Sequence, residues 1–257
     1  MYRYTIENET HMWRVWFLWR EMKIHSYTAM LYLGFVLGIA GGAHAAKLHG
    51  LDPKRVYVVM VVLILPALIG GRLLFVATHW EAFRYAPRRI WRSGSGAALY
   101  GGLLFSLVIS LPIVRILDVS ITGFWDSMAI AMLIGLVPSK MGCLLNGCCS
   151  GRESTGRFAL YLPNENGIWR RRIPTQLFEA GGAVILLTLS FSIWNRFPQA
   201  GVTFFLALGG YSTVRWLIES RREAAVMFAG MNLNRLISAA LAAISVSSLL
   251  FMWFRNY

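Results

Sequence analysis

The sequence predicts an all-α polytopic membrane protein with seven transmembrane helices. Of its 257 residues 56% are hydrophobic and only 14% are charged, and long uncharged stretches separate the charges. A soluble domain has about 25% charged residues, and a membrane-spanning helix needs about 20 mostly apolar ones. The composition therefore excludes a disordered chain and disfavours a soluble one. In a membrane protein the net charge of +13 points to anionic lipid head groups, and we expect no nucleic-acid partner.

Seven segments are predicted to cross the bilayer. Four contain no Lys, Arg, Asp or Glu and are long enough to span it unaided, at residues 24–46, 93–114, 197–214 and 236–254. Three more are apolar but carry a charge near one end, at about 56–78, 121–143 and 175–194.

Residues 1–26 are predicted to form an N-terminal interfacial arm, and residues 27–257 the membrane domain. The arm mixes charges with aromatic residues that suit the head-group level of a bilayer, namely Trp13, Trp16, Phe17 and Trp19. It lacks the apolar core and small-residue cleavage site of a secretory signal. Between the fourth and fifth spans, about 146–173, we expect a small irregular head with short strands near 157–162.

The charged residues of the spans are predicted to meet at one polar site. Seven spans place the loops alternately on two membrane faces, here called face A, which carries the N-terminus, and face B, which carries the C-terminus. Five charges then lie at one depth near face A: Arg72, Lys140, Glu179, Arg215 and Glu219. Charges inside a bilayer are costly, so they normally face a protein interior or a polar cavity and pair with each other.

The first motif of this site is KMGCLLNGCCSG, at residues 140–151. The small residues Gly142, Gly147 and Gly151 allow a ligand close to the backbone, and Asn146 offers both hydrogen-bond donors and acceptors. A helix end capped by Asn146 and Gly147 explains the same residues equally well.

The three cysteines of the chain, Cys143, Cys148 and Cys149, all lie in this motif. They could act as a thiolate nucleophile, a disulfide or half of a metal site. Zinc takes about four nitrogen or sulfur ligands, and only the distant His79 could help. We therefore favour apolar packing for the cysteines, and we expect neither a metal nor a cofactor.

Two helix ends supply further polar groups at the same depth. Capping preferences explain Pro174 and Glu179 but not the additional amide of Gln176. Four residues spaced i, i+4, i+8 and i+11 fall on one helical face, Tyr211, Arg215, Glu219 and Arg222. A structural ion ladder is the alternative interpretation of this second group.

Paired glycines mark two other segments, Gly70-Gly71 and Gly101-Gly102. Such pairs permit close contact between membrane helices. Packing does not explain Arg72, which directly follows the first pair.

Segments along nearly the whole chain resemble motifs of the prolipoprotein diacylglyceryl transferase family, in the family's order. They are HSY at 25–27, GGRLLFVATHW at 70–80, RSGSGAALYGG at 92–102, KMGCLLNGCCSGR at 140–152, IPTQLFEA at 173–180, YSTVRWLIESRR at 211–222 and GMNLNRLIS at 230–238. No single motif is specific, but seven in order identify the chain as a member of this family.

The resemblance implies a multi-pass inner-membrane enzyme that moves a diacylglyceryl group from phosphatidylglycerol, or a related anionic phospholipid, to the lipobox cysteine of a prolipoprotein signal peptide, releasing glycerol phosphate. It implies catalytic roles for Tyr100, Asn146, Arg215 and Glu219. It implies substrate binding by Arg72, Lys140, Gly142, Gly147, Gly151, Gln176, Glu179, Tyr211 and Arg222. Cys143, Cys148 and Cys149 are kept as candidate reactive thiols.

Several residues depart from the family pattern. Tyr100 stands where the family has a histidine, and Lys140 replaces an arginine. Lysine cannot form the paired, bidentate hydrogen bonds that an arginine guanidinium forms. Cys143 replaces an asparagine, Cys148 a glutamate and Ile173 a histidine. The alternatives are therefore transfer to a different acceptor and a non-catalytic phospholipid-binding membrane protein.

Orientation is the point on which charge and resemblance disagree. Face B receives six cations, Lys47, Lys54, Arg55, Arg115, Arg196 and Arg255, leaving 19 of the 25 to face A. The positive-inside rule would put face A in the cytoplasm. The resemblance implies the opposite, with the N-terminus outside and the C-terminus cytoplasmic, and we follow it because several face A cations belong to the predicted site.

Overall fold

The computed structural model describes residues 15–19, 22–84, 98–164, 167–194, 199–223, 227–228 and 231–255. The chain divides into two compact units, unit 1 (residues 1–41 and 129–257) and unit 2 (residues 42–128). Residues 92–97 of the predicted glycine-rich segment lie outside the described residues. So does Trp13, and so do the side chains of the other aromatic anchors predicted for the arm.

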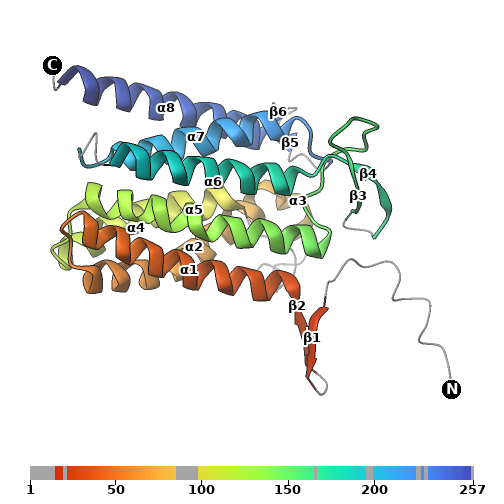
Figure 1. Cartoon of the computed structure of the whole chain (residues 1–257), viewed down its shortest axis with the longest axis horizontal. Coiled ribbons are helices and arrows are strands. Elements are labelled where there is room, and N and C mark those ends of the chain that lie inside the picture. The colour runs from red at the N-terminus through yellow and green to blue at the C-terminus, as the bar shows by residue number, and fades with distance from the viewer. Residues whose placement is uncertain are drawn as a thin grey trace. The chain divides into compact units, whose positions relative to one another are not determined.

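Seven long helices occupy the seven predicted spans (Figure 1). They are α1 (Ser26–Leu48), α2 (Pro53–Thr78), α4 (Leu99–Ile116), α5 (Ile121–Asn146), α6 (Thr175–Trp194), α7 (Val202–Glu219) and α8 (Leu233–Arg255); α3 (Trp80–Phe83) is a single turn. All but α7 are long and apolar enough to cross a membrane. Helix α7 has 18 residues, as α4 does, but it carries Arg215 and Glu219, which make it less apolar. The described helices confirm the predicted polytopic all-α class.

Three short antiparallel hairpins complete the described elements. They pair β1 (Val15–Trp19) with β2 (Met22–His25), β3 (Leu160–Pro163) with β4 (Trp169–Arg172), and β5 (Met227–Phe228) with β6 (Met231–Asn232). The strands expected near 157–162 begin later, because residues 156–159 form a turn. In this turn the amide of Ala159 donates a 3.0 Å hydrogen bond to the carbonyl of Gly156. Leu160 then pairs with Arg172.

In unit 2, helices α2 and α4 pack against each other through their glycines. A Cβ atom placed on Gly70 would lie 2.5 Å from the carbonyl oxygen of Gly101, and one placed on Gly101 would lie 2.3 Å from that of Gly70. These two backbones therefore approach too closely for any side chain between them, as the paired glycines predicted.

In unit 1, helices α6, α7 and α8 lie side by side (Figure 1). A small apolar core joins α5, α6 and α7 through Ala129, Leu133, Ala183, Leu186 and Ala207. Large apolar side chains of α8, including Leu250, Phe251 and Phe254, are exposed. Such an outward apolar surface suits contact with lipid chains.

Candidate functional site

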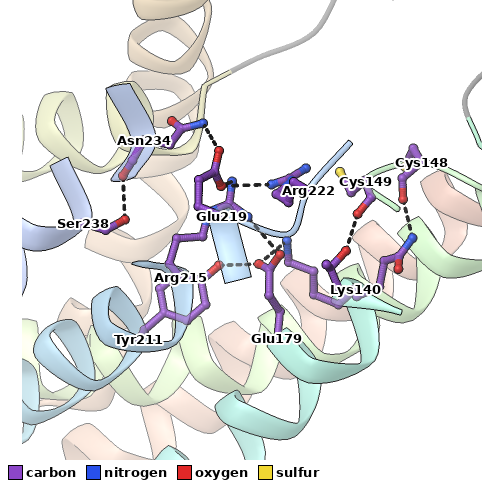
Figure 2. Close-up of polar contacts among 12 residues, drawn as sticks. Lys140, Cys148, Cys149, Glu179, Tyr211, Arg215, Glu219, Arg222, Asn234 and Ser238 are labelled. Carbon is purple, nitrogen blue, oxygen red and sulfur yellow. Dashed lines mark hydrogen bonds and ion pairs between the residues drawn. The ribbon is translucent and has the colours of Figure 1, made fainter. Parts of the chain in front are cut away.

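Two fully buried carboxylates, Glu179 and Glu219, lie in unit 1 (Figure 2). Glu179 belongs to the second turn of α6, and Glu219 is the last residue of α7. Neither side chain has any exposed surface. Because a buried charge is very costly without partners, each carboxylate must be paired by cations and hydrogen-bond donors.

Glu179 has three such partners. Its Oε1 accepts a 2.9 Å hydrogen bond from Nη1 of Arg215, while its Oε2 accepts one of 2.9 Å from the hydroxyl of Tyr211. The Nζ of Lys140, near the end of α5, lies 2.6 Å from the same Oε2. One carboxylate thus joins α5, α6 and α7.

Glu219 is paired from three directions as well. Nη2 of Arg215 lies 3.0 Å and Nη1 of Arg222 3.9 Å from its Oε2, and Nδ2 of Asn234 donates a 3.1 Å hydrogen bond to its Oε1. The carbonyl of Asn234 accepts a 2.7 Å bond from the hydroxyl of Ser238. Arg215 bridges both carboxylates.

The residues Lys140, Glu179, Arg215, Glu219 and Arg222 are here called the charge network. It contains three cations and two carboxylates, which leaves one net positive charge. Lys140 and Arg222 lie at its edge, with 11% and 13% of their side chains exposed. The network is therefore suited to receive one further anionic group through these two side chains.

A tight turn connects the network to the end of α5. Gly147 follows the last helical residue, Asn146, with a left-handed φ of 73°, and Cys149 has a φ of 61°. Nε2 of Gln176 donates a 2.6 Å hydrogen bond to the carbonyl of Cys148, and the hydroxyl of Thr175 donates one of 2.6 Å to that of Cys149. The first turn of α6 thereby holds the backbone of this turn.

Gly151 closes the turn where only glycine fits. It pairs with Arg222 in an antiparallel bridge, and a Cβ atom at this position would lie 2.6 Å from the carbonyl oxygen of Ile173. Arg222 therefore does not continue the face of α7 as its spacing predicted. Helix α7 ends at Glu219, and the chain turns back to pair with Gly151.

A buried arginine connects the head to this region. Arg172 at the end of β4 is 1% exposed and forms ion pairs with Glu223 at 2.8 Å and with Glu153 at 3.4 Å. Both partners are far more exposed than Arg172. This arginine therefore connects the β3–β4 hairpin to the segment that follows α7.

Two predicted site residues belong to unit 2. The guanidinium of Arg72 lies 5.6 Å from the ring centre of Phe75 and 5.5 Å from that of Phe83, within the range of cation–π contacts. Tyr100, in the first turn of α4, is buried.

The other predicted residues come together in unit 1. The charge network and Tyr211 form one group (Figure 2). The second group lies along the end of α5 and the turn after it: Gly142, Cys143 and Asn146 are still helical, and Gly147, Cys148, Cys149 and Gly151 belong to the turn. Gln176, in the first turn of α6, joins this group through its hydrogen bond to the carbonyl of Cys148. Sequence reasoning missed Asn234, Thr175 and Arg172. An amide in the first turn of an otherwise apolar last span was the available signal for Asn234, whereas nothing distinguished Arg172 from the arginines beside it.

Comparison with known proteins gives a consistent result. The model of the prolipoprotein diacylglyceryl transferase family matches residues 14–253. Phosphatidylglycerol–prolipoprotein diacylglyceryl transferase 2 of Clostridium perfringens is 25% identical, over 79% of this chain and 80% of that protein. Phosphatidylglycerol–prolipoprotein diacylglyceryl transferases of Bacillus cytotoxicus and Bacillus anthracis are 26% and 27% identical, over 87% of this chain and 86% of each protein.

Proposed function

Since the chain belongs to the prolipoprotein diacylglyceryl transferase family and is a multi-pass membrane transferase, we propose that it moves a diacylglyceryl group from phosphatidylglycerol to the lipobox cysteine thiol of a prolipoprotein. The sulfur attacks the terminal glyceryl carbon of the lipid, and the bond from that carbon to the phosphate oxygen breaks. Glycerol phosphate leaves with the electron pair of that bond, and the thiol proton passes to solvent as the carbon–sulfur bond of the new thioether forms.

The net positive charge of the charge network is the observation that carries this proposal. A phosphodiester has one negative charge, and its phosphate gains charge as it leaves. Lys140 has three donors, of which one faces Glu179, and Arg222 is held by a long 3.9 Å ion pair. Charge-assisted hydrogen bonds from these two side chains would stabilise the departing phosphate.

Arg215 would act chiefly by holding this arrangement in place. Its two terminal nitrogens lie 2.9 Å from Glu179 and 3.0 Å from Glu219, so the guanidinium has a defined orientation between two buried carboxylates. Preorganised charges of this kind need not rearrange during the reaction.

Gln176 supplies a group suited to the lipid head group. Its Nε2 is used by the carbonyl of Cys148, and its buried Oε1 has no hydrogen-bond partner among the described residues. A buried acceptor without a partner is costly. A hydroxyl of the glycerol head group is a donor that would satisfy it.

The test is mass spectrometry of the purified protein incubated with phosphatidylglycerol and a lipobox peptide. We expect the peptide to gain one diacylglyceryl group while one glycerol phosphate is released. Replacing Lys140 with Met should slow both products about 100-fold, as loss of one transition-state donor does elsewhere. Lys54→Met, which removes an exposed lysine outside the network, is the matched control.

Two results would contradict the proposal. Release of glycerol phosphate with an unmodified peptide would mean hydrolysis or another acceptor. Lipid binding without either product would favour a non-catalytic phospholipid-binding protein.

We further propose that the N-terminus lies outside the cytoplasm and the C-terminus inside. The family resemblance supports this orientation, and the head and the network would then lie on the outer side. Fusing alkaline phosphatase, which is active only outside the cytoplasm, to the C-terminus should give no phosphatase activity. High activity would instead indicate the inverted chain that the cation count favours.

A further inference from the structure

Three sulfur atoms converge in the turn after α5. The Sγ atoms of Cys143, Cys148 and Cys149 all lie within 4.8 Å of one another, and all three cysteines are free. Cys143 belongs to the last turn of α5, and the left-handed Gly147 returns the chain so that the other two cysteines face it. Apolar packing, the role that the sequence favours, does not require three sulfurs to meet.

The backbone adopts an unfavourable conformation to achieve this convergence. Cys149 has a φ of 61°, a left-handed conformation that is uncommon outside glycine. Conformations of this kind persist only where the surroundings impose them, and they cluster at binding sites. Here the 2.6 Å hydrogen bonds from Thr175 and Gln176 hold the carbonyls of Cys149 and Cys148.

The spacing of the sulfurs matches that of ligands around a single metal ion. Zinc lies about 2.3 Å from a thiolate sulfur, so three sulfurs in a plane around it are about 4.0 Å apart. That separation lies within the observed limit of 4.8 Å. Small rotations of the side chains would bring all three sulfurs to bonding distance.

The donor set selects the class of ion. Soft thiolates select zinc, copper(I) and similar ions, whereas calcium and magnesium require oxygen ligands. Among the described residues no His, Asp or Glu joins the sulfur group.

We propose that Cys143, Cys148 and Cys149 bind one thiophilic d10 metal ion, zinc(II) or copper(I), through three thiolate sulfurs. Copper(I) would need no further ligand, whereas zinc would take a water molecule as its fourth ligand in place of the distant His79. Each ligating thiol releases its proton to solvent when the ion binds. The ion connects the end of α5 to the turn held by α6. This site does not depend on the proposed transfer reaction, so either can fail without the other.

The test measures metal directly on the full-length protein in detergent. Elemental analysis of protein purified under reducing conditions should find one zinc or one copper per chain, and the element found distinguishes the two ions. After removal of the metal, cobalt(II) serves as the probe, because its thiolate charge-transfer absorption reports sulfur ligation. We expect one cobalt per chain, displaced by zinc.

Single replacements then assign the ligands. Cys143→Ser, Cys148→Ser and Cys149→Ser should each lower the bound metal from one per chain to near zero. Ser150→Ala, in the same turn but without a sulfur, should keep it. Size-exclusion chromatography identifies any variant that fails to fold. If all three variants fail to fold, the cobalt spectrum of the unaltered protein still tests whether the sulfurs bind metal.

Two outcomes would overturn the proposal. One is folded, reduced protein that has three maleimide-reactive thiols but no cobalt absorption at saturating metal. The other is purified protein in which two of the thiols react only after reduction, since that would indicate a disulfide in place of a metal site.

Discussion

Replacing Glu179 with Gln should destabilise the protein strongly, although the two side chains have nearly the same shape. Glu179 is fully buried and lies 2.6 Å from Nζ of Lys140 and 2.9 Å from Nη1 of Arg215. Gln removes the negative charge and leaves Lys140 without a carboxylate, while Arg215 keeps Glu219 at 3.0 Å. Breaking a buried ion pair from one side costs about 3–5 kcal/mol, and we expect about 3 kcal/mol because Arg215 retains a partner.

The assay is reversible unfolding in mixed detergent and dodecyl sulfate micelles, followed by circular dichroism. Glu81→Gln is the matched control, because Glu81 forms a 3.1 Å ion pair with Arg84 but its side chain is 81% exposed. Exposed pairs contribute less than about 1 kcal/mol, so this variant should unfold nearly as the unaltered protein does.

A double variant tests the cause. Glu179→Gln combined with Lys140→Met removes both members of the pair. The double variant should therefore lose about 1–2 kcal/mol less free energy of unfolding than the two single variants lose in sum. The reasoning would be refuted if Glu179→Gln cost no more than Glu81→Gln, or if the two changes were additive.

Three further predictions concern other parts of the chain. Gly142→Ala should lower the free energy of unfolding by about 1–3 kcal/mol, because its Cβ would lie 2.8 Å from Cβ of Met30. In the same assay Gly181→Ala, whose Cβ would meet nothing within 4 Å, should cause no loss, and equal losses would refute the packing argument. Asn234→Leu should cost about 1.5–3 kcal/mol, since it removes the 3.1 Å hydrogen bond to the buried carboxylate of Glu219, and an unchanged unfolding curve would show that this bond contributes nothing. Burial lowers the pKa of His49 in the folded protein below its ordinary 6.5, so the unfolded chain binds a proton at this residue more readily. The free energy of unfolding should therefore be highest above pH 6.5 and should fall as the pH drops through the pKa of the folded state. Unfolding curves between pH 8 and pH 5 should show this loss in the unaltered protein and a smaller one in His49→Asn; identical pH profiles would contradict it.

Local sequence features were sufficient to predict the membrane architecture. Charges are costly inside a bilayer, and lipid offers no hydrogen-bond partner to the backbone, so long uncharged stretches had to become helices. The seven long helices overlap the predicted spans, although α7 lies further along the chain than its uncharged stretch and includes Arg215 and Glu219. The turn at Asn146 and Gly147 was also predictable, because an amide and a glycine after an apolar run end a helix.

The partners of the charges were not predictable in this way. Spacing placed Arg215 and Glu219 on one helical face, but it could not indicate that Arg215 also bridges to Glu179 on α6. Asn234 is far from Glu219 in the sequence, and their 3.1 Å hydrogen bond exists because α8 packs against α7.

The cysteines show the same division between local and long-range information. Their spacing left a nucleophile, a disulfide, a metal ligand and a packing residue as alternatives. The left-handed Cys149 and the hydrogen bonds from α6 bring the three sulfurs within 4.8 Å of one another. Local sequence thus determines where helices begin, end and enter the membrane, because solvation and backbone preferences act residue by residue. Which buried polar groups meet depends on the packing of segments distant in sequence, and packing is a property of the folded chain.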